Sequence, residues 1–220
     1  MKIVCISDTH NRHRKLEIPE GDVLIHAGDA TMSGKPRELF PFIEWMGKQP
    51  HAVKLFVPGN HDFDVEKNIA LYKRVCRENG VYLLIDEPIR IGEEKLVVYG
   101  TPWVPNLSGW AFYGDSVTLA HRFGRIPDGT QVLITHGPPE GTLDVGPAGN
   151  AYHIGSAHLA LRVGELPDLK LHVFGHIHQG YGQKMVSRLR CGNDTEHLAV
   201  NAAICTEEYE PTNKPIVVEV

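Results

Sequence analysis

The sequence predicts an α/β protein in which two mixed β-sheets are flanked by helices. Strand-like apolar runs alternate with helix-like amphipathic runs over residues 1–80, and several strand-like runs then follow one another closely. The 220 residues suffice for one domain with a continuous core, and no internal repeat, low-complexity tract or linker interrupts them. We therefore expect residues 1–220 to form a single domain.

The N-terminal elements follow from hydrophobic periodicity and from the residues that interrupt it. Buried strands are predicted over residues 2–7, 22–26 and 52–57. Helical spacing of apolar residues predicts helices over residues 36–48 and 65–78. Pro36 suits a first helical turn, Pro58-Gly59 ends the third strand, and Asn79-Gly80 closes the second helix.

The later elements are shorter and less regular. Further strands are predicted over residues 81–84, 88–91, 95–100, 131–135, 171–174, 185–190, 198–202 and 216–220, with a helix over 115–123. The stretch 137–155 is rich in Gly and Pro. It is either a surface loop or a wall of a substrate pocket, since it directly follows His136, a candidate ligand.

Composition narrows the class of protein. The formal net charge is −5 without a basic stripe, which disfavours a long nucleic acid as partner. Cys5, Cys76, Cys191 and Cys205 form no C-x-x-C pair and are expected to be reduced thiols in or near the core. Neither a signal peptide nor an apolar run of membrane-spanning length is recognisable, so we expect a cytoplasmic protein without membrane association.

Histidine is abundant, with 13 residues, and several histidines lie beside Asp, Asn or Gly. Five polar clusters end or follow predicted strands: Asp8-Thr9-His10, Gly28-Asp29, Gly59-Asn60-His61-Asp62, Thr135-His136 and Gly175-His176-Ile177-His178. Ligand sites in α/β proteins gather at the carboxyl ends of strands, so these clusters are expected to converge. Single clusters such as D-x-H or Gly-Asp are common for structural reasons, whereas all five in this order and context are specific.

The residue types indicate two divalent metal ions. Mixed carboxylate and imidazole ligands suit Mn, which we expect first, and also Fe, Zn or Ni. Seven groups are available as ligands: Asp8, His10, Asp29, Asn60, His136, His176 and His178. Asp29 is the expected bridging ligand, because its two oxygens can face two ions. Gly28, Gly59 and Gly175 are expected to let the backbone turn sharply and approach closely beside the clusters.

Such a site suits hydrolysis of a phosphoester by a metal-bridging hydroxide, because the ions lower the pKa of water and offset phosphoryl charge. His61 is the candidate for stabilising charge or protonating the leaving oxygen, and Asp62 is expected to orient His61 and keep it cationic. His26 is expected to be a hydrogen-bonded core residue. His13 lies near the first cluster, but we expect no contact with substrate.

The five clusters resemble the calcineurin-like metallophosphoesterase superfamily. The resemblance implies a four-layer αββα sandwich. It also implies that Asp8, His10, Asp29 and His178 bind one ion, and that Asp29, Asn60, His136 and His176 bind the other. Ala30 stands where purple acid phosphatases carry a ligating Tyr, and Asp62 ends a cluster in which Ser/Thr protein phosphatases have Glu. Both branches are therefore disfavoured.

A closer resemblance lies outside the ligands, in the brain-type metallophosphoesterase-domain subgroup. It rests on residues 99–103, 110–112, 135–139, 178–182 and 211–215. It implies cleavage of a small phosphodiester, with a cyclic nucleotide as the expected substrate and Asn60, His61 and Trp103 as expected contacts. Trp110, Phe112 and Tyr181 are further candidates for stacking on a base. A nuclease, a phosphomonoesterase and a non-catalytic scaffold stay as alternatives, and the oligomeric state is open.

Overall fold

The structure of the protein is a computed structural model that describes residues 1–146, 152–188 and 195–220. Within these ranges, the first sheet has the strand order β11-β1-β2-β3-β4. The bounds are Lys2–Ile6 for β1, Val23–His26 for β2, Val53–Phe56 for β3, Tyr82–Leu83 for β4 and Ile216–Glu219 for β11. β1 to β4 run parallel, and β11 pairs antiparallel with β1.

The second sheet has the order β5-β6-β7-β8-β10-β9 in the described part of the chain. The bounds are Glu87–Ile91 for β5, Leu96–Thr101 for β6, Val132–Thr135 for β7, Leu171–Phe174 for β8, Gly182–Arg188 for β9 and Thr195–Asn201 for β10. β6, β7, β8 and β10 are parallel, whereas the edge strands β5 and β9 are antiparallel to their neighbours.

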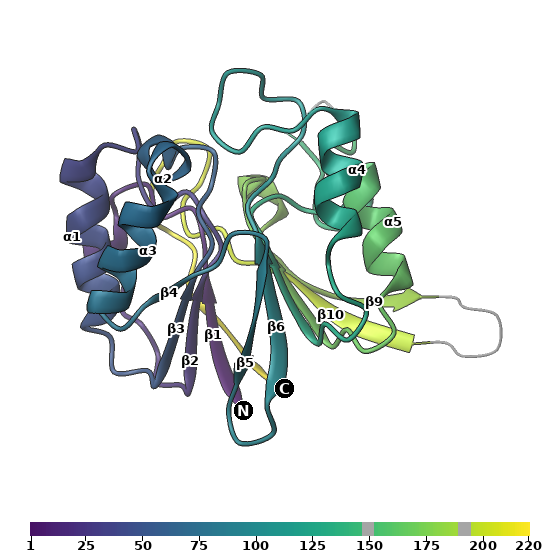
Figure 1. The fold of residues 1–220 in the computed structure, drawn as a ribbon, viewed down its shortest axis with the longest axis horizontal. Coiled ribbons are helices and arrows are strands. Elements are labelled where there is room, and N and C mark those ends of the chain that lie inside the picture. Colours follow the sequence, from purple (N-terminus) through teal and green to yellow (C-terminus); the bar gives the residue numbers. More distant parts are fainter. Residues whose placement is uncertain (147–151, 189–194) are drawn as a thin grey trace.

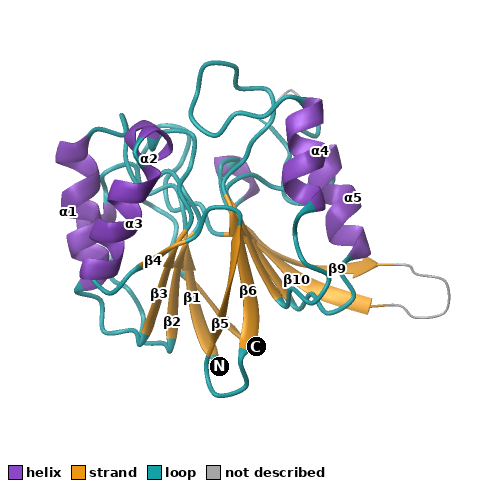
Figure 2. Ribbon diagram, viewed as in Figure 1, coloured by secondary structure: helices purple, strands orange, loops and turns teal. Residues whose placement is uncertain are grey.

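Helices cover the outer face of each sheet (Figures 1 and 2). The first sheet is covered by α1 (Pro36–Gly47), α2 (Phe63–Lys67) and α3 (Ile69–Glu78), and the second by α4 (Ser116–Gly124) and α5 (Ala157–Glu165). Two short 3-10 helices, η1 (His13–Lys15) and η2 (His178–Gly180), lie in loops. The predicted four-layer αββα sandwich of two mixed sheets is confirmed.

Alternation along β1 explains how the layers hold together. Ile3 and Cys5 point into the cluster between the sheets, where they join residues such as Val132 from the second sheet. Val4 and Ile6 point outward into the cluster that α1 and α3 cover. Because successive strand residues face opposite sides, one apolar run fills two cores. This continuous burial fixes the strand ends from which the functional loops leave.

Two helix predictions need correction. The single helix expected over 65–78 is divided at Asn68, whose φ of −132° and ψ of 43° leave the helical region. The Asn68 side-chain amide donates to Asp64 Oδ1 at 3.0 Å across the last turn of α2. Helix α5 was not predicted, and it buries only Leu159 and Val163. Ser156 caps it by accepting from the Leu159 amide.

The remaining core predictions concern cysteine and histidine. Cys5, Cys76 and Cys205 are buried free thiols as expected, whereas Cys191 and the predicted strand residues 189–190 lie outside the described residues. His26 is fully buried, with Nε2 2.9 Å from Thr9 Oγ1, which confirms its structural role. His13 is buried against Phe42 and Trp45 rather than in the site. No helix among the described residues is long and apolar enough to cross a membrane.

Candidate metal centre

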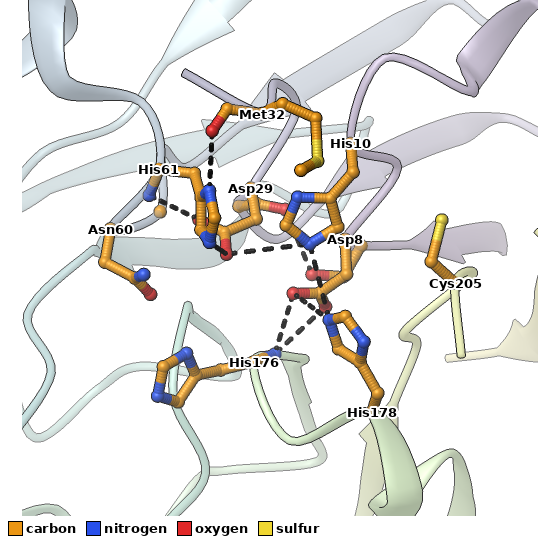
Figure 3. Close-up of polar contacts among 12 residues, drawn as sticks. Asp8, His10, Asp29, Met32, Asn60, His61, His176, His178 and Cys205 are labelled. Atoms are coloured by element: carbon orange, nitrogen blue, oxygen red, sulfur yellow. Dashed lines mark hydrogen bonds and ion pairs between the residues drawn. The ribbon is translucent and has the colours of Figure 1, made fainter. Parts of the chain in front are cut away.

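The five polar clusters leave the carboxyl ends of β1, β2, β3, β7 and β8. Figure 3 shows labelled residues from four of them turned toward one another, and His136 of the fifth lies 2.9 Å from Asn60. Ile6 and His26 are register partners, as are His26 and Phe56, so the first three strands end level. Ile134 and Val173 align β7 with β8 in the same way. The parallel pairing therefore brings together ligand candidates as far apart in sequence as Asp8 and His178.

The first group of candidates, called here the Asp8 half, consists of Asp8, His10 and His178. His10 Nε2 lies 3.3 Å from His178 Nε2, and His178 Nε2 lies 3.5 Å from Asp8 Oδ1. His10 Nδ1 is 3.3 Å from the Thr31 carbonyl, and His178 Nδ1 is 2.8 Å from the Thr206 carbonyl. In the neutral rings each Nδ1 therefore carries the proton, and two Nε2 lone pairs face one another beside a carboxylate. This donor set fits a cation.

The second group, called here the His136 half, consists of Asn60, His136 and His176. His136 Nδ1 is 2.9 Å from the Ala27 carbonyl, so Nε2 of the neutral ring presents a lone pair. That Nε2 lies 2.9 Å from Asn60 Oδ1 and 3.3 Å from Asp29 Oδ1, both of which are also acceptors. Asp29, His136 and His176 have ligand atoms within 4.8 Å of one another. This half also fits a cation.

Asp29 lies between the two halves. Its Oδ1 faces His136 Nε2 at 3.3 Å, and its Oδ2 is 3.8 Å from His10 Nε2. Burial would raise the pKa of this carboxyl, but the positive charge and hydrogen bond of His136 outweigh burial and hold it well below its usual range. Asp29 therefore stays ionised with one oxygen toward each half.

The protonation states show how the protein balances the buried carboxylates without ions. Burial lowers the pKa of His178, but Asp8 outweighs it and raises that pKa to about 9. For His136, Asp29 likewise outweighs burial and raises the pKa to about 9. Burial dominates at His176, where the pKa falls to about 4. Each half thus contains one imidazole whose cationic form a neighbouring carboxylate favours.

Three glycines make the approach of these loops possible. A Cβ at Gly28 would overlap His136 Nδ1, one at Gly59 would overlap Asp29 Oδ1, and one at Gly175 would overlap Asp8 Oδ2. Gly28 also has a φ of +108°. The expectation that glycines allow close approach beside the clusters is confirmed.

The expectation for Asp62 is wrong. Its buried carboxylate accepts from the backbone amides of Gly59, Ala30 and Thr31 and from Thr31 Oγ1, at 2.8 to 3.3 Å. It therefore ties the Asp29 loop to the Asn60 loop. His61 instead has Nδ1 2.8 Å from the Met32 carbonyl and Nε2 3.9 Å from Asp29 Oδ2 (Figure 3). The sequence could not show which acceptor each side chain uses, because several acceptors lie close together in these short turns.

A cavity of about 340 Å³ opens over the centre, lined by His10, Asp29, Asn60, His61, Leu107, Trp110, Ile154, His176, Ile177, His178, Gln179, Glu207 and Tyr209. Trp110 lies 4.7 Å from His61 between ring centroids. Ile154 comes from the 137–155 stretch, so this stretch contributes to the cavity wall, whereas residues 147–151 lie outside the described residues. Tyr209 was not predicted, although it precedes the 211–215 motif.

Trp103 is not among the described residues that line this cavity, and its expected contact with substrate stays a prediction. Trp103 Nε1 donates to Asp86 Oδ2 at 2.9 Å, and Arg122 lies over the ring at 4.2 Å. Phe112 is buried, and the Tyr181 hydroxyl donates to the Lys214 carbonyl. Of the four aromatic candidates, only Trp110 is among the described residues around the cavity.

The profile of calcineurin-like phosphoesterases matches residues 1–180. The chain belongs to this family. Human metallophosphoesterase domain-containing protein 1 is 38% identical over 99% of this chain and 70% of the human protein, and the mouse protein is equally similar. Members bind divalent metal ions and hydrolyse phosphoesters, and the clusters described above can hold such ions.

Solved structures share the fold of this family member at low sequence identity. A phosphopantetheinyl hydrolase from Mycobacterium tuberculosis has a TM-score of 0.59 at 14% identity, over 98% of this chain and 95% of that chain. The protein TT1561 of Thermus thermophilus has a TM-score of 0.62 at 14% identity, over 91% and 88% of the two chains. These two structures therefore share with this chain the architecture that carries the loops.

Proposed function

We propose that residues 1–220 form one catalytic domain that hydrolyses small phosphodiesters with a dinuclear metal centre. The observation that carries the proposal is the pair of converging acceptor sets that share Asp29. In this proposal Asp8, His10, Asp29 and His178 hold one ion, and Asp29, Asn60, His136 and His176 hold the other. Manganese is our first choice, with Fe, Zn and Ni compatible with the same ligands.

When bound, the two ions would supply a water of lowered pKa and neutralise charge on the phosphoryl oxygens. The protein's own part is to orient His61 and to transfer a proton from it. The Met32 carbonyl holds Nδ1 of His61, so Nε2 points into the cavity. From there Nε2 can donate a proton to the leaving oxygen. Asp62 contributes by fixing the loops that carry Asp29 and Asn60.

The cavity favours a substrate with one phosphate and an apolar or planar group. Leu107, Trp110, Ile154 and Tyr209 line it, and neither Lys nor Arg occurs among its described lining residues. A di- or triphosphate would find no Lys or Arg side chain among these residues to neutralise its further charge. A cyclic nucleotide meets these conditions, with the base against the apolar wall, and the net charge of −5 agrees with a small substrate rather than a nucleic acid.

The test is reconstitution of metal-free protein with single ions. Bis-p-nitrophenyl phosphate, p-nitrophenyl phosphate and 2′,3′- and 3′,5′-cyclic nucleotides would be compared by kcat/KM at equal metal loading. We expect metal-dependent turnover, with cyclic nucleotides preferred over the simple monoester. Equal or better turnover of p-nitrophenyl phosphate would support a phosphomonoesterase instead. Binding of at most one ion in excess manganese would contradict the dinuclear centre.

A further inference from the structure

Residues 203–210 follow β10 and cross from the second sheet to the loops above the first. Ile204 N donates to the Ser7 carbonyl at 2.9 Å, and Cys205 N donates to the Asp8 carbonyl at 3.3 Å. The Thr206 carbonyl then lies 2.8 Å from His178 Nδ1 and accepts from the Tyr209 amide at 2.9 Å. The same carbonyl therefore fixes the tautomer of a proposed metal ligand and the place of Tyr209.

Tyr209 is held in an unusual backbone conformation that directs its ring toward the centre. Its φ is +60°, a left-handed value that is strained for a bulky residue. The ring centroid lies 4.8 Å from that of His10, 5.9 Å from His178 and 6.4 Å from His61. The ring is only partly buried and lines the cavity. Among the described residues, its aromatic neighbours are these three imidazoles, and it belongs to none of the hydrophobic core clusters.

Trp110 provides a second aromatic surface beside the same imidazole. Its centroid lies 4.7 Å from His61 and 5.5 Å from Phe63, and its side chain is 39% exposed. Two unrelated loops thus each bring a large, partly exposed aromatic ring next to His61. Such rings bind planar groups such as nucleobases through their faces.

We propose that Tyr209 and Trp110 are specificity-determining residues that hold the planar group of the substrate, a nucleobase, beside His61. The proposal rests on the proposed function and adds the residues that select among phosphodiesters. Glu207 and Gln179 are the polar side chains of this cavity outside the proposed ligands and His61 in the described chain. They can pair with N–H or O–H groups of the base or sugar. Glu207 also disfavours a second phosphate, because its carboxylate repels another anion.

The first measurement compares substrates that differ only in the base. Wild type, Tyr209→Phe, Tyr209→Leu and Trp110→Leu would hydrolyse adenosine 2′,3′-cyclic phosphate and methyl riboside 2′,3′-cyclic phosphate. We expect Tyr209→Leu and Trp110→Leu to lower kcat/KM about tenfold for the adenosine compound only. Tyr209→Phe retains the ring and should stay within about twofold. Tyr82→Leu is the matched control, since Tyr82 is 51% exposed on the edge strand β4.

The second measurement needs no turnover. Calorimetry would compare binding of adenosine 5′-monophosphate and ribose 5-phosphate to metal-loaded wild type and variants, with metal content measured alongside. Tyr209→Asn would also be included, because Asn tolerates positive φ and so preserves the turn. We expect it to lose the preference for the nucleotide while keeping its metal.

The outcomes separate the two proposals. Hydrolysis of bis-p-nitrophenyl phosphate without any preference for nucleotides in wild type overturns the aromatic site and leaves the proposed function intact. Preferential binding of the nucleotide that requires both rings, without metal-dependent hydrolysis of any phosphodiester, supports the aromatic site and overturns the function. Equal losses on both substrates, or lost metal in Tyr209→Asn, would show that Tyr209 only supports His178.

Discussion

The two halves of the proposed metal centre each contain two imidazoles but hold them differently. In the Asp8 half, both imidazoles are oriented by backbone carbonyls, those of Thr31 and Thr206. In the His136 half, His136 is oriented by the Ala27 carbonyl, whereas the His176 ring has no hydrogen bond within the described residues and packs on His136 at 4.9 Å. Outer partners of metal-binding histidines raise affinity by fixing the ring. We therefore expect the Asp8 half to bind the tighter ion.

The largest effect is expected from removing the residue that the halves share. Asp29→Asn removes a charge that faces both His10 and His136, so both ions should be lost and kcat should fall by more than about 100-fold. Metal analysis and steady-state kinetics would measure this. Asp86→Asn is the control, because Asp86 is also a largely buried carboxylate but pairs with Arg122. Retention of both ions in Asp29→Asn would contradict a bridging role.

A pair of ligand variants tests the difference between the halves directly. His176→Ala should weaken only the second, looser ion, by about 10- to 100-fold, and leave the first titration step near wild type. His178→Ala should weaken the tight step and so reduce occupancy at low metal concentration. Stepwise metal titration by calorimetry reads both constants. The reverse order of effects would show that anchoring by carbonyls does not rank the two halves.

His61 adjoins the centre without belonging to either half in our assignment. His61→Ala should lower kcat by about 100-fold, because the variant lacks the group that donates a proton. Both ions should remain, since the proposed ligand sets do not include His61. His121→Ala, an exposed change on α4, is the control. Loss of metal together with activity would place His61 among the ligands, where its position within 4.8 Å of His10 and Asp29 ligand atoms would allow it.

The smallest expected effect is the pH dependence of metal affinity, which should be alike in the two halves. The pKa values of His178 and His136 are both raised to about 9, so both rings are protonated at pH 7 without metal. Each ion must displace one proton, and affinity should therefore rise with pH and level off above about 9, by up to about tenfold per pH unit and site. Calorimetry in buffers of different ionisation enthalpy would count the protons. Release of none would contradict these protonation states.

The convergence of the candidate ligands could be predicted from sequence, because their position after strands is local information. Asp8 follows β1 and His176 follows β8, and the parallel pairing of strands within each sheet brings such strand ends to the same edge. The pairing of β11 with β1 joins opposite ends of the chain and left no local pattern. Helix α5 was missed, although it is as long as the predicted helix α4 and buries as many residues.

The cavity wall was harder to predict than its base. Whether Trp103 or Trp110 faces the centre depends on which loop passes Asp86, since that carboxylate holds the Trp103 indole. Tyr209 depends on a turn with positive φ that brings the last part of the chain over His178. Both positions follow from tertiary contacts of loops, for which hydrophobic periodicity carries no information.

Backbone conformation also limits how such a site can change during evolution. Asp8, His10, Asp29 and His176 have φ values of 51°, 40°, 53° and 68°. Among residues other than glycine, Asp, Asn and His are the types that tolerate this region best, and Asp and His are also ligands for divalent ions. An exchange of Asp for Glu keeps the charge, but Glu tolerates positive φ less well than Asp. Few single substitutions at these positions would therefore preserve the site. The residue types that fit these four positions are thus limited both by the proposed role in metal binding and by the main-chain conformation.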